Sequence, residues 1–589
     1  MALSGRSKRR WLLPAIGALV AQAATIVWLT WPFAARAATH LPAFFGRAAT
    51  ECLLLAWALA HESRALFGQP WVFPHGNAFY PESHALFYGE AGFGAVPLFA
   101  PIFLATGNPT LALNFMLLAG VLLTTTALHL VITRWTGSWT AGLVGGWFFL
   151  TQHWVLWTWI AHAPNYAVLP YLPLIMWLAA KPLAGVAGVL GLAALVALQG
   201  LTSVYVAAAT LLPLGILALV RLARGATRAS GLRLLAVLGL ALLTLVPAYS
   251  GYLVVRAQNP QLREQTVYRV VRMGAVALPW GPFAGGEPMA LPPLAVLLIG
   301  IGLGHRLLRR HDPGRPGTPS AWWNGALWAA VGLVASLTPV AIWHGRRVNL
   351  PHAWLAAWLP VYDVLRAPNR LGVAGLMGLT VLTGTAFAEC LHPFRRVHSI
   401  AMRGVLTAGL ASLVGAGLYV HYAAGVDALG FVPGAALPRE YPLARPPELA
   451  PPLAEILAAR PGPLLEAPVG PGTQPHAEAM YRSIFHRRPL LNGYDGYWPA
   501  GFPMRMQLAC RLPDLDALLE LHLVAGVETI LVHLRALDDA GPAPPPYGCP
   551  PDMPRSDAWL AAGTSAGSHL RLLARHGDDL LFAAGPLAR

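Results

Sequence analysis

Long apolar runs constrain the fold of this 589-residue chain more than any other feature. One of them, LLAVLGLALLTLVPAYSGYLVV at 234–255, carries no charged side chain. It is long enough to cross a hydrocarbon layer, which takes roughly 20 helical residues. Hydrophobic residues make up 56% of the chain and charged residues 11%, whereas a soluble domain carries about a quarter charged residues. We therefore expect a membrane protein.

The formal charge of +15 is the one global feature that nucleic-acid binding would also explain. The basic residues, however, form short clusters between the apolar runs. Topology signals and anionic head groups account for clusters in those places. We expect membrane lipids, and no nucleic acid, as partners.

Hydropathy predicts about eleven transmembrane helices. The basic segment SGRSKRR precedes an apolar stretch at 11–31 that lacks a small-residue cleavage site, so we expect a retained anchor. A window of about 19 residues places the other spans at 111–133, 139–160, 165–180, 183–200, 202–221, 233–255, 290–305, 321–343, 371–390 and 404–423.

Basic loops give the expected orientation. Short loops carry Arg134, Lys181, Arg221, Arg306 and Arg395, and all of them fall on the side of the N-terminus. Since cytoplasmic loops are the basic ones, this side is predicted to be cytoplasmic. An odd number of spans then places everything after about residue 425 on the opposite, extracytoplasmic face.

The chain divides into four predicted parts. Residues 1–31 form the cytoplasmic N-terminus and first helix, 32–110 a long extracytoplasmic loop, 111–424 the remaining helices, and 425–589 a folded tail. In the tail, LAPPLAEILAAR and LDALLELHLVAG have helical spacing, GPLLEAPV and VETILVHL read as strands, and LRLLARHGDDLLFAAG as a hairpin. This alternation predicts an α/β domain.

Four cysteines are too few for a disulfide-dense scaffold, and their spacing matches no zinc site. Cys510 and Cys549 both lie in the tail. A disulfide between them is compatible with an oxidising compartment, and free thiols are equally compatible with the sequence.

The first long loop carries the acidic candidates for catalysis. Glu51 precedes the apolar stretch CLLLAWALA, and Glu90 ends FYGE. A carboxylate at a helix start on the membrane surface can serve as a general base. It can also simply stabilise the helix N-terminus, an effect typically under about 1 kcal/mol. Position alone leaves both interpretations open.

Aromatic and histidine side chains of the same loop are candidate substrate-binding residues. The stretch FPHGNAFYP is rich in turns and rings, and such rings either stack against a sugar or pack at the membrane interface. His75, Tyr80 and Tyr88 are the residues selected here. His75 and His84 are nine positions apart in an irregular loop and match no metal-ligand spacing.

Arginines on the expected outer face form the third group of candidates. Arg256, Arg263, Arg269 and Arg272 share one loop, and Arg346, Arg347, Arg366 and Arg370 share another. Guanidinium groups pair with phosphate oxygens in a bidentate manner. Head-group contacts or loop salt bridges are the alternative. Arg366 and Arg370, in LRAPNRLG just before a transmembrane span, stand where a lipid phosphate would lie.

The order of several short motifs resembles the bacterial GT-C superfamily of polytopic membrane glycosyltransferases and its uncharacterised relatives. These motifs are AWALAHESRAL, NAFYPESHALFYGE, TGNPTLALNFMLL, LQGLTSVYVAA, YDVLRAPNRLGVAGLMGLTVLTG and the tail stretches PLLEAPVG and AEAMYRSIFHRRPLLNGYDGYWP. They extend over most of the chain.

The resemblance implies transfer of a sugar from a polyprenyl-phosphate carrier to a glycan, lipid or protein acceptor at the outer face of the bacterial inner membrane. Glu51 stands where the relatives usually carry an aspartate, and it would deprotonate the acceptor hydroxyl. Glu90 is the second acidic candidate. Arg366 or Arg370 would hold the departing phosphate. Some GT-C enzymes use a divalent metal and others do not, and this sequence is compatible with both.

Two other functions fit the same features. A flippase or transporter for a lipid-linked glycan would share the helices and outer arginines, but it predicts ionisable residues inside the spans, where few occur. A non-catalytic scaffold is compatible with glutamate in place of the usual aspartate.

Overall fold

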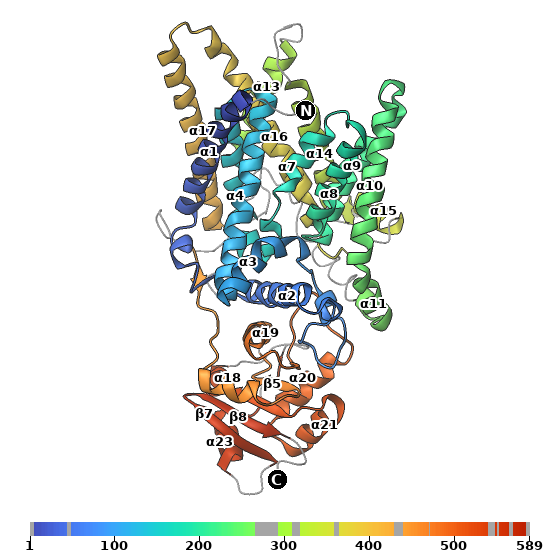
Figure 1. Ribbon diagram of the computed structural model, residues 1–589, viewed down its shortest axis with the longest axis vertical. Coiled ribbons are helices and arrows are strands. Elements are labelled where there is room, and N and C mark those ends of the chain that lie inside the picture. The colour runs from blue at the N-terminus through green and yellow to red at the C-terminus, as the bar shows by residue number, and fades with distance from the viewer. Residues whose placement is uncertain are drawn as a thin grey trace.

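The computed structural model describes residues 5–43, 49–152, 154–264, 292–308, 318–337, 339–344, 346–358, 365–428, 440–470, 472–539, 548–550, 553–564 and 569–584. Figure 1 shows a bundle of long helices with the C-terminal domain at one end and the N-terminus toward the other. Of the outer-loop arginines named above, Arg269 and Arg272 lie outside the described residues.

A helix lies in every one of the eleven ranges that hydropathy marked as a span. The helices are α1 (Gly5–Leu29), α4 (Pro109–Thr136), α5 (Trp139–Leu150), α7 (Tyr171–Ala179), α8 (Gly185–Gly200), α9 (Val204–Ala223), α10 (Arg228–Ala248), α13 (Pro293–Leu308), α14 (Thr318–Ser336), α16 (Val373–Cys390) and α17 (Ile400–Ala428).

Six of the helices in the described part are long and apolar enough to cross a membrane: those at 12–29, 109–136, 204–223, 225–248, 368–394 and 400–423. The chain is therefore a helical, multi-pass membrane protein, as predicted. The helices α5 and α7 are shorter than the expected spans 139–160 and 165–180. The chain between them forms a π-helix (Trp154–Trp159), the short α6 (Ile160–His162) and a 3-10 turn (Pro164–Ala167).

Small residues let the central helix α16 pack closely against α14. A Cβ atom on Gly332 would lie 2.0 Å from the backbone nitrogen of Gly375, and one on Gly378 would lie 2.2 Å from that of Ala329. Such close backbone approach is the usual basis of helix association in lipid, where apolar burial gives no driving force between helices.

The first long loop is helical in large part. It contains α2 (Thr50–Phe67) and α3 (Val96–Thr106), joined by 3-10 turns that include Ala85–Tyr88. In Figure 1, α2 lies across the ends of the membrane helices, between them and the C-terminal domain. The short strands β1 (Leu41–Pro42) and β4 (Leu443–Ala444) pair and tie this loop to the start of the C-terminal domain.

The C-terminal domain is an α/β domain, as the tail pattern predicted. Its sheet has the order β5-β6-β8-β7, with β5 (Leu464–Ala467) parallel to β6 (Thr529–His533). The predicted hairpin is β7 (Leu570–His576) and β8 (Asp579–Ala584). Helices α18 (Pro451–Ala458), α19 (Gln474–His486), α20 (Phe502–Arg511), α21 (Leu515–Ala525), α22 (Leu534–Asp539) and α23 (Ser556–Thr564) surround the sheet.

A disulfide joins Cys510 in α20 to Cys549, with Cα atoms 5.4 Å apart. The sequence left this pairing open. Further elements lie around the membrane helices: α11 (Ser250–Gln258), the hairpin β2 (Val340–Trp343) and β3 (Arg346–Asn349), α15 (Pro351–Trp358) and the 3-10 turn Pro368–Gly372 that leads into α16.

Candidate active site

A cavity of about 340 Å³ lies where the membrane helices meet the C-terminal domain. It brings together four of the residues that the sequence selected: Glu51, Glu90, Arg366 and Arg370. The other polar or aromatic lining residues are Trp57, His162, Asn165, Tyr494 and Asp495. We call this space the reaction cavity.

Glu51 lies in the first turn of α2 and is half-buried. The hydroxyl of Tyr494 donates a hydrogen bond of 2.5 Å to its Oε1 atom. No described residue donates a hydrogen bond to the second oxygen, Oε2, and the side chain lines the cavity. The hydrogen-bond partner of Glu51 therefore comes from the C-terminal domain and not from α2.

Glu90 is held by two partners on opposite sides. Arg370 Nη1 lies 3.1 Å from Glu90 Oε2, and the Ser203 hydroxyl donates to Glu90 Oε1. The Arg370 guanidinium also lies 5.7 Å from the ring centre of Tyr166 and 5.4 Å from that of Tyr205. Aromatic faces attract a cation at such distances. The Glu90 charge is therefore largely balanced within the protein.

Residues of the C-terminal domain hold the Arg366 side chain in place. It donates to the backbone oxygen of Gly496 and lies 5.3 Å from the ring centre of Tyr497. The backbone N–H of Ala367 donates to the hydroxyl of Tyr205 at 3.0 Å, which fixes the chain between the two arginines. The remaining N–H groups of Arg366 leave it able to bind an anion in the cavity.

Asp495 is a third carboxyl group on the cavity, and the sequence did not single it out. A Cβ atom on Gly89 would lie 1.4 Å from Asp495 Oδ1, so only glycine at position 89 leaves room for this side chain. Burial, with Glu51 and Glu90 nearby, raises the pKa of Asp495 to about 7, although the Gly496 N–H and Arg366 act to lower it. Asp495 thus changes its charge near neutral pH.

An apolar cavity of about 80 Å³ adjoins the reaction cavity. The two cavities share Glu90, Arg366 and Gly496 in their linings. The rest of the smaller lining is largely hydrocarbon and aromatic and includes one further charged residue, Arg256. Its other side chains are Phe87, Val204, Tyr205, Tyr252, Val255, Leu262 and Tyr497. An arginine therefore stands at the junction of a polar and an apolar space.

The histidine and tyrosine candidates of the first long loop, His75, Tyr80 and Tyr88, lie outside the reaction cavity. Tyr88 is buried, its hydroxyl accepts a hydrogen bond of 2.9 Å from Asn259, and burial raises its pKa to about 12. Tyr80 donates its backbone N–H to Leu490 O at 2.9 Å, which joins the loop to the C-terminal domain. His75 lines a separate cavity at the other end of α2.

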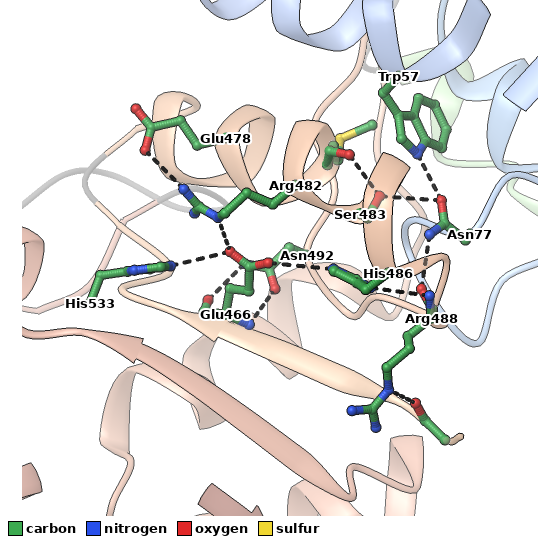
Figure 2. A network of polar contacts seen from close by, with 12 residues as sticks. Trp57, Asn77, Glu466, Glu478, Arg482, Ser483, His486, Arg488, Asn492 and His533 are labelled. Atoms are coloured by element: carbon green, nitrogen blue, oxygen red, sulfur yellow. Dashed lines mark hydrogen bonds and ion pairs between the residues drawn. The ribbon is translucent and has the colours of Figure 1, made fainter. Parts of the chain in front are cut away.

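A buried charge network organises the C-terminal domain beside these cavities (Figure 2). Glu466 on β5 accepts from Arg482 Nε at 2.7 Å, and His533 lies between Glu466 at 3.3 Å and Asp579 at 2.7 Å. Burial alone would raise the pKa of Glu466, but Arg482 and the two nearby histidines hold it well below its usual range.

The same network reaches α2. Trp57 Nε1 donates to Asn77 Oδ1 at 2.8 Å, and Asn77 Nδ2 donates to the backbone oxygen of Arg488 at 2.9 Å. Figure 2 shows this chain of contacts leading from α2 into the C-terminal domain. The domain is thereby fixed to the helix that carries Glu51.

The described residues contain no group of three histidine, cysteine, aspartate or glutamate side chains placed to hold a metal ion. Glu90 is already paired with Arg370, and a guanidinium beside a carboxylate opposes cation binding there. The donor set of the reaction cavity does not fit a divalent metal.

No protein-family model matches the chain, and no curated protein matches it. Among solved structures, it is similar to ArnT from Cupriavidus metallidurans in the apo state. That match has a TM-score of 0.44 and 16% sequence identity, and it covers 99% of this chain and 100% of the other. At these values the likeness identifies neither a family nor an activity for this chain.

Proposed function

We propose that this protein is a membrane glycosyltransferase that moves a sugar from a polyprenyl-phosphate carrier to an acceptor hydroxyl. One observation carries the proposal: Glu51, Arg366 and Arg370 line a single cavity at the junction of the membrane helices and the C-terminal domain. The cavity thus combines a candidate base with two anion-binding groups.

The adjoining cavities suit the two chemical halves of such a donor. Arg366 lines both spaces, so a phosphate held by Arg366 and Arg370 would have its lipid chain directed into the apolar cavity. Guanidinium groups bind phosphate oxygens through paired N–H groups, which supports this assignment. The sugar would then lie in the polar space in front of Glu51.

The reaction is a single displacement that inverts the anomeric carbon. Glu51 accepts the proton of the acceptor hydroxyl while the acceptor oxygen forms a bond to the anomeric carbon of the sugar. The bond between that carbon and the phosphate oxygen breaks, and its electron pair stays on the phosphate. The arginines stabilise the extra negative charge of the leaving polyprenyl phosphate.

The partners of the two glutamates favour Glu51 over Glu90 as the base. Glu90 has an arginine and a hydroxyl on its two oxygens, whereas Glu51 has a single hydrogen bond from Tyr494. Both oxygens of Glu90 are thus occupied by partners within the protein, which leaves Glu90 less able to accept a proton from a substrate hydroxyl. We assign Glu90 to holding Arg370 in place.

The reaction would take place on the outer face of the bacterial inner membrane. The Cys510–Cys549 disulfide supports this orientation, because disulfides persist in oxidising compartments and are rare in the cytosol. The basic loops of the sequence support the same orientation through the positive-inside rule.

The test is a comparison of cell-surface glycans by mass spectrometry. A strain that lacks this protein is complemented with the wild type, with Glu51→Gln or with the control Glu455→Gln, at matched membrane levels. Glu455 is an exposed residue of α18, so its substitution removes a carboxylate far from the cavity. We expect the deletion and Glu51→Gln strains to lack the same sugar and Glu455→Gln to restore it.

Two results would contradict the proposal in different ways. Full restoration of the glycan by Glu51→Gln would exclude Glu51 as the base. The Glu90→Gln variant would then be tested as the alternative. A glycan profile that is unchanged by deletion would exclude the transferase itself and favour a flippase or a scaffold, the two functions that share these structural features.

A further inference from the structure

A second large cavity, of about 610 Å³, lies at the C-terminal end of α2. It is lined by α2, by the loop that follows α2, by Leu104 of α3 and by the C-terminal end of α19 with Arg487 after it. Its polar lining residues are His61, Arg64, Gln69, His75, Asn77, Ser483 and Arg487. We call this space the basic cavity, because its lining contains arginine and histidine but no aspartate or glutamate.

The two arginines of the basic cavity have no carboxylate partner among the described residues. Arg64 donates from Nη1 to the backbone oxygen of Ile484 at 2.7 Å and lies 4.9 Å from the ring centre of Phe103. Burial and the like charge of Arg487 lower the pKa of Arg64 to about 10, so it stays charged at neutral pH. Two cations without a neutralising acid favour an anion between them.

Arg487 occupies a backbone position that arginine does not favour. It follows the last residue of α19 with φ of 57°, in the left-handed region where glycine is the usual residue. A non-glycine residue there is strained, and such strain persists where the side chain has a use. Glycine at this position would close the helix more easily but would supply no guanidinium to the cavity.

His75 adds a hydrogen-bond donor to the same space. Its Nδ1 atom accepts the backbone N–H of His84 at 3.3 Å. A neutral imidazole with an accepting Nδ1 carries its proton on Nε2, so the other ring nitrogen is a donor. His75 was selected from the sequence as a substrate-binding residue, and the basic cavity is where the structure places it.

The basic cavity and the reaction cavity share a wall. The buried side chain of Trp57 lines both, and its indole N–H is fixed by Asn77 (Figure 2). Trp57 therefore separates the two cavities, and a molecule with an anionic group in the basic cavity would have to extend past this buried side chain to present a hydroxyl to Glu51.

Exposed apolar side chains flank the basic cavity. Phe67 and Trp71 are 73% and 72% exposed, and they adjoin the lining residues Gly68 and Val72 in the chain. Leu104, itself a lining residue, is 50% exposed. Aromatic and aliphatic side chains exposed beside a membrane bundle are typical of the lipid–water interface. The surroundings suit a ligand with a hydrocarbon part.

We propose that the basic cavity binds the phosphate of a lipid-borne acceptor and holds that acceptor beside Glu51. The acceptor role of the ligand rests on the proposed function. The anion site itself is inferred from the cavity, its two arginines without a carboxylate partner among the described residues, and the exposed apolar side chains beside it. The cavity would recognise a phosphate group, which a lipid or a soluble phosphate could supply. The experiment distinguishes these two sources.

The experiment measures phospholipid binding to the purified full-length protein in neutral detergent by native mass spectrometry. The probes are phosphatidic acid, phosphatidylcholine as a lipid without net charge, and inorganic phosphate. The variants are Arg487→Gly, Glu51→Gln and the control Arg571→Gln, which removes an exposed arginine from β7. Thermal unfolding of each variant is recorded alongside.

We expect Arg487→Gly to bind phosphatidic acid about tenfold more weakly than the wild type, the usual effect of losing a charge-assisted contact. Its unfolding temperature should stay the same or rise, because glycine relieves the left-handed backbone. Arg571→Gln and Glu51→Gln should bind phosphatidic acid as the wild type does. Phosphatidylcholine and inorganic phosphate should bind more weakly than phosphatidic acid.

Equal affinity of Arg487→Gly and the wild type would overturn the anion site. Inorganic phosphate binding as tightly as phosphatidic acid would overturn the lipid-borne part of the proposal. The failure of the proposed function has a different signature. In that case Glu51→Gln would leave the surface glycans unchanged, whereas Arg487→Gly would still weaken phosphatidic acid binding.

Discussion

The two cavities at the ends of α2 differ in how their charges are balanced. The reaction cavity holds the carboxyl groups of Glu51, Glu90 and Asp495 with the guanidinium groups of Arg366 and Arg370. The basic cavity holds the guanidinium groups of Arg64 and Arg487 and no carboxyl group. A site that must lose and gain protons needs acids and bases together, whereas a site that only retains an anion needs unbalanced positive charge.

One helix and one domain serve both cavities. Glu51 and Arg64 are 13 positions apart on α2, which corresponds to about 20 Å along a helix axis. The C-terminal domain completes each cavity, with Tyr494 and Asp495 at one end and Ser483 and Arg487 at the other. The difference between the cavities therefore lies in their side chains and not in separate scaffolds.

Replacing Glu51 with glutamine should give the largest difference between the two cavities: sugar transfer should fall while lipid binding stays the same. Loss of a general base is expected to lower kcat by about 10³-fold, or about 4 kcal/mol of activation free energy. Binding of phosphatidic acid should not change. The measurement is sugar transfer in reconstituted membranes together with native mass spectrometry. A parallel loss of lipid binding would show that the two cavities are not independent.

Removing the disulfide should affect both cavities together. The bond closes a loop with a sequence separation of 39 residues, and the loop-entropy relation gives about 4 kcal/mol for that length. The double variant Cys510→Ser/Cys549→Ser should unfold at a lower temperature than the wild type. It should lose sugar transfer and phosphatidic acid binding at the same temperature. Dithiothreitol should reproduce this shift in the wild type and add nothing in the variant. A loss confined to one cavity would contradict the shared scaffold.

A lysine at position 370 tests geometry in the reaction cavity without removing charge. Lysine keeps a cation beside Glu90 but lacks the planar pair of N–H groups that fits phosphate. We expect kcat/KM for the donor to fall about tenfold to a hundredfold. Arg571→Lys serves as the matched control and should leave kcat/KM unchanged. Wild-type kinetics in Arg370→Lys would remove Arg370 from donor binding.

Asp495 should make the reaction cavity sensitive to pH near 7. Its pKa is raised from 3.8 to about 7, so the folded protein retains a proton there that the unfolded chain loses. The contribution of Asp495 to stability therefore falls as pH rises from about 4 to 7. Above pH 7 its negative charge also opposes a phosphate beside Arg366.

The expected readout is the donor KM as a function of pH. In the wild type the donor KM should rise severalfold as the pH passes 7, the smallest effect among these predictions. Asp495→Asn should show no such step, because asparagine does not titrate. A step that persists in Asp495→Asn would assign the titration to another group of the cavity.

The sequence was sufficient for the membrane helices and for most of the C-terminal sheet. Apolar length is a local property, so every one of the eleven expected ranges contains a helix. The hairpin β7–β8 followed from the alternation around HGDD. The expected spans 139–160 and 165–180 already left a break at 161–164, but the π-helix Trp154–Trp159 was not predicted, because hydropathy does not distinguish a π-helix from an α-helix.

The candidate site was predicted in its membrane half and missed in its C-terminal half. Glu51, Glu90 and the two arginines lie in or beside the membrane loops, where charge is rare enough to be noticed. The Tyr494 hydroxyl reaches Glu51 across 443 positions of sequence, and Asp495 lines the same cavity; no local pattern encodes such an arrangement. The aromatic stretch NGYDGYWP was the available signal, but it was compatible with several roles.

The continuous helix α2 has a consequence for the choice of acceptor. Regular helix geometry, and not a flexible loop, sets the distance between Glu51 at the start of α2 and Arg64 of the basic cavity near its end. The length of α2 would therefore select among acceptors. A molecule whose hydroxyl lies too close to its phosphate could not contact Glu51 and the basic cavity at the same time. Inserting or deleting residues in α2 would change the distance between Glu51 and the basic cavity, and with it the length of acceptor that the protein can use.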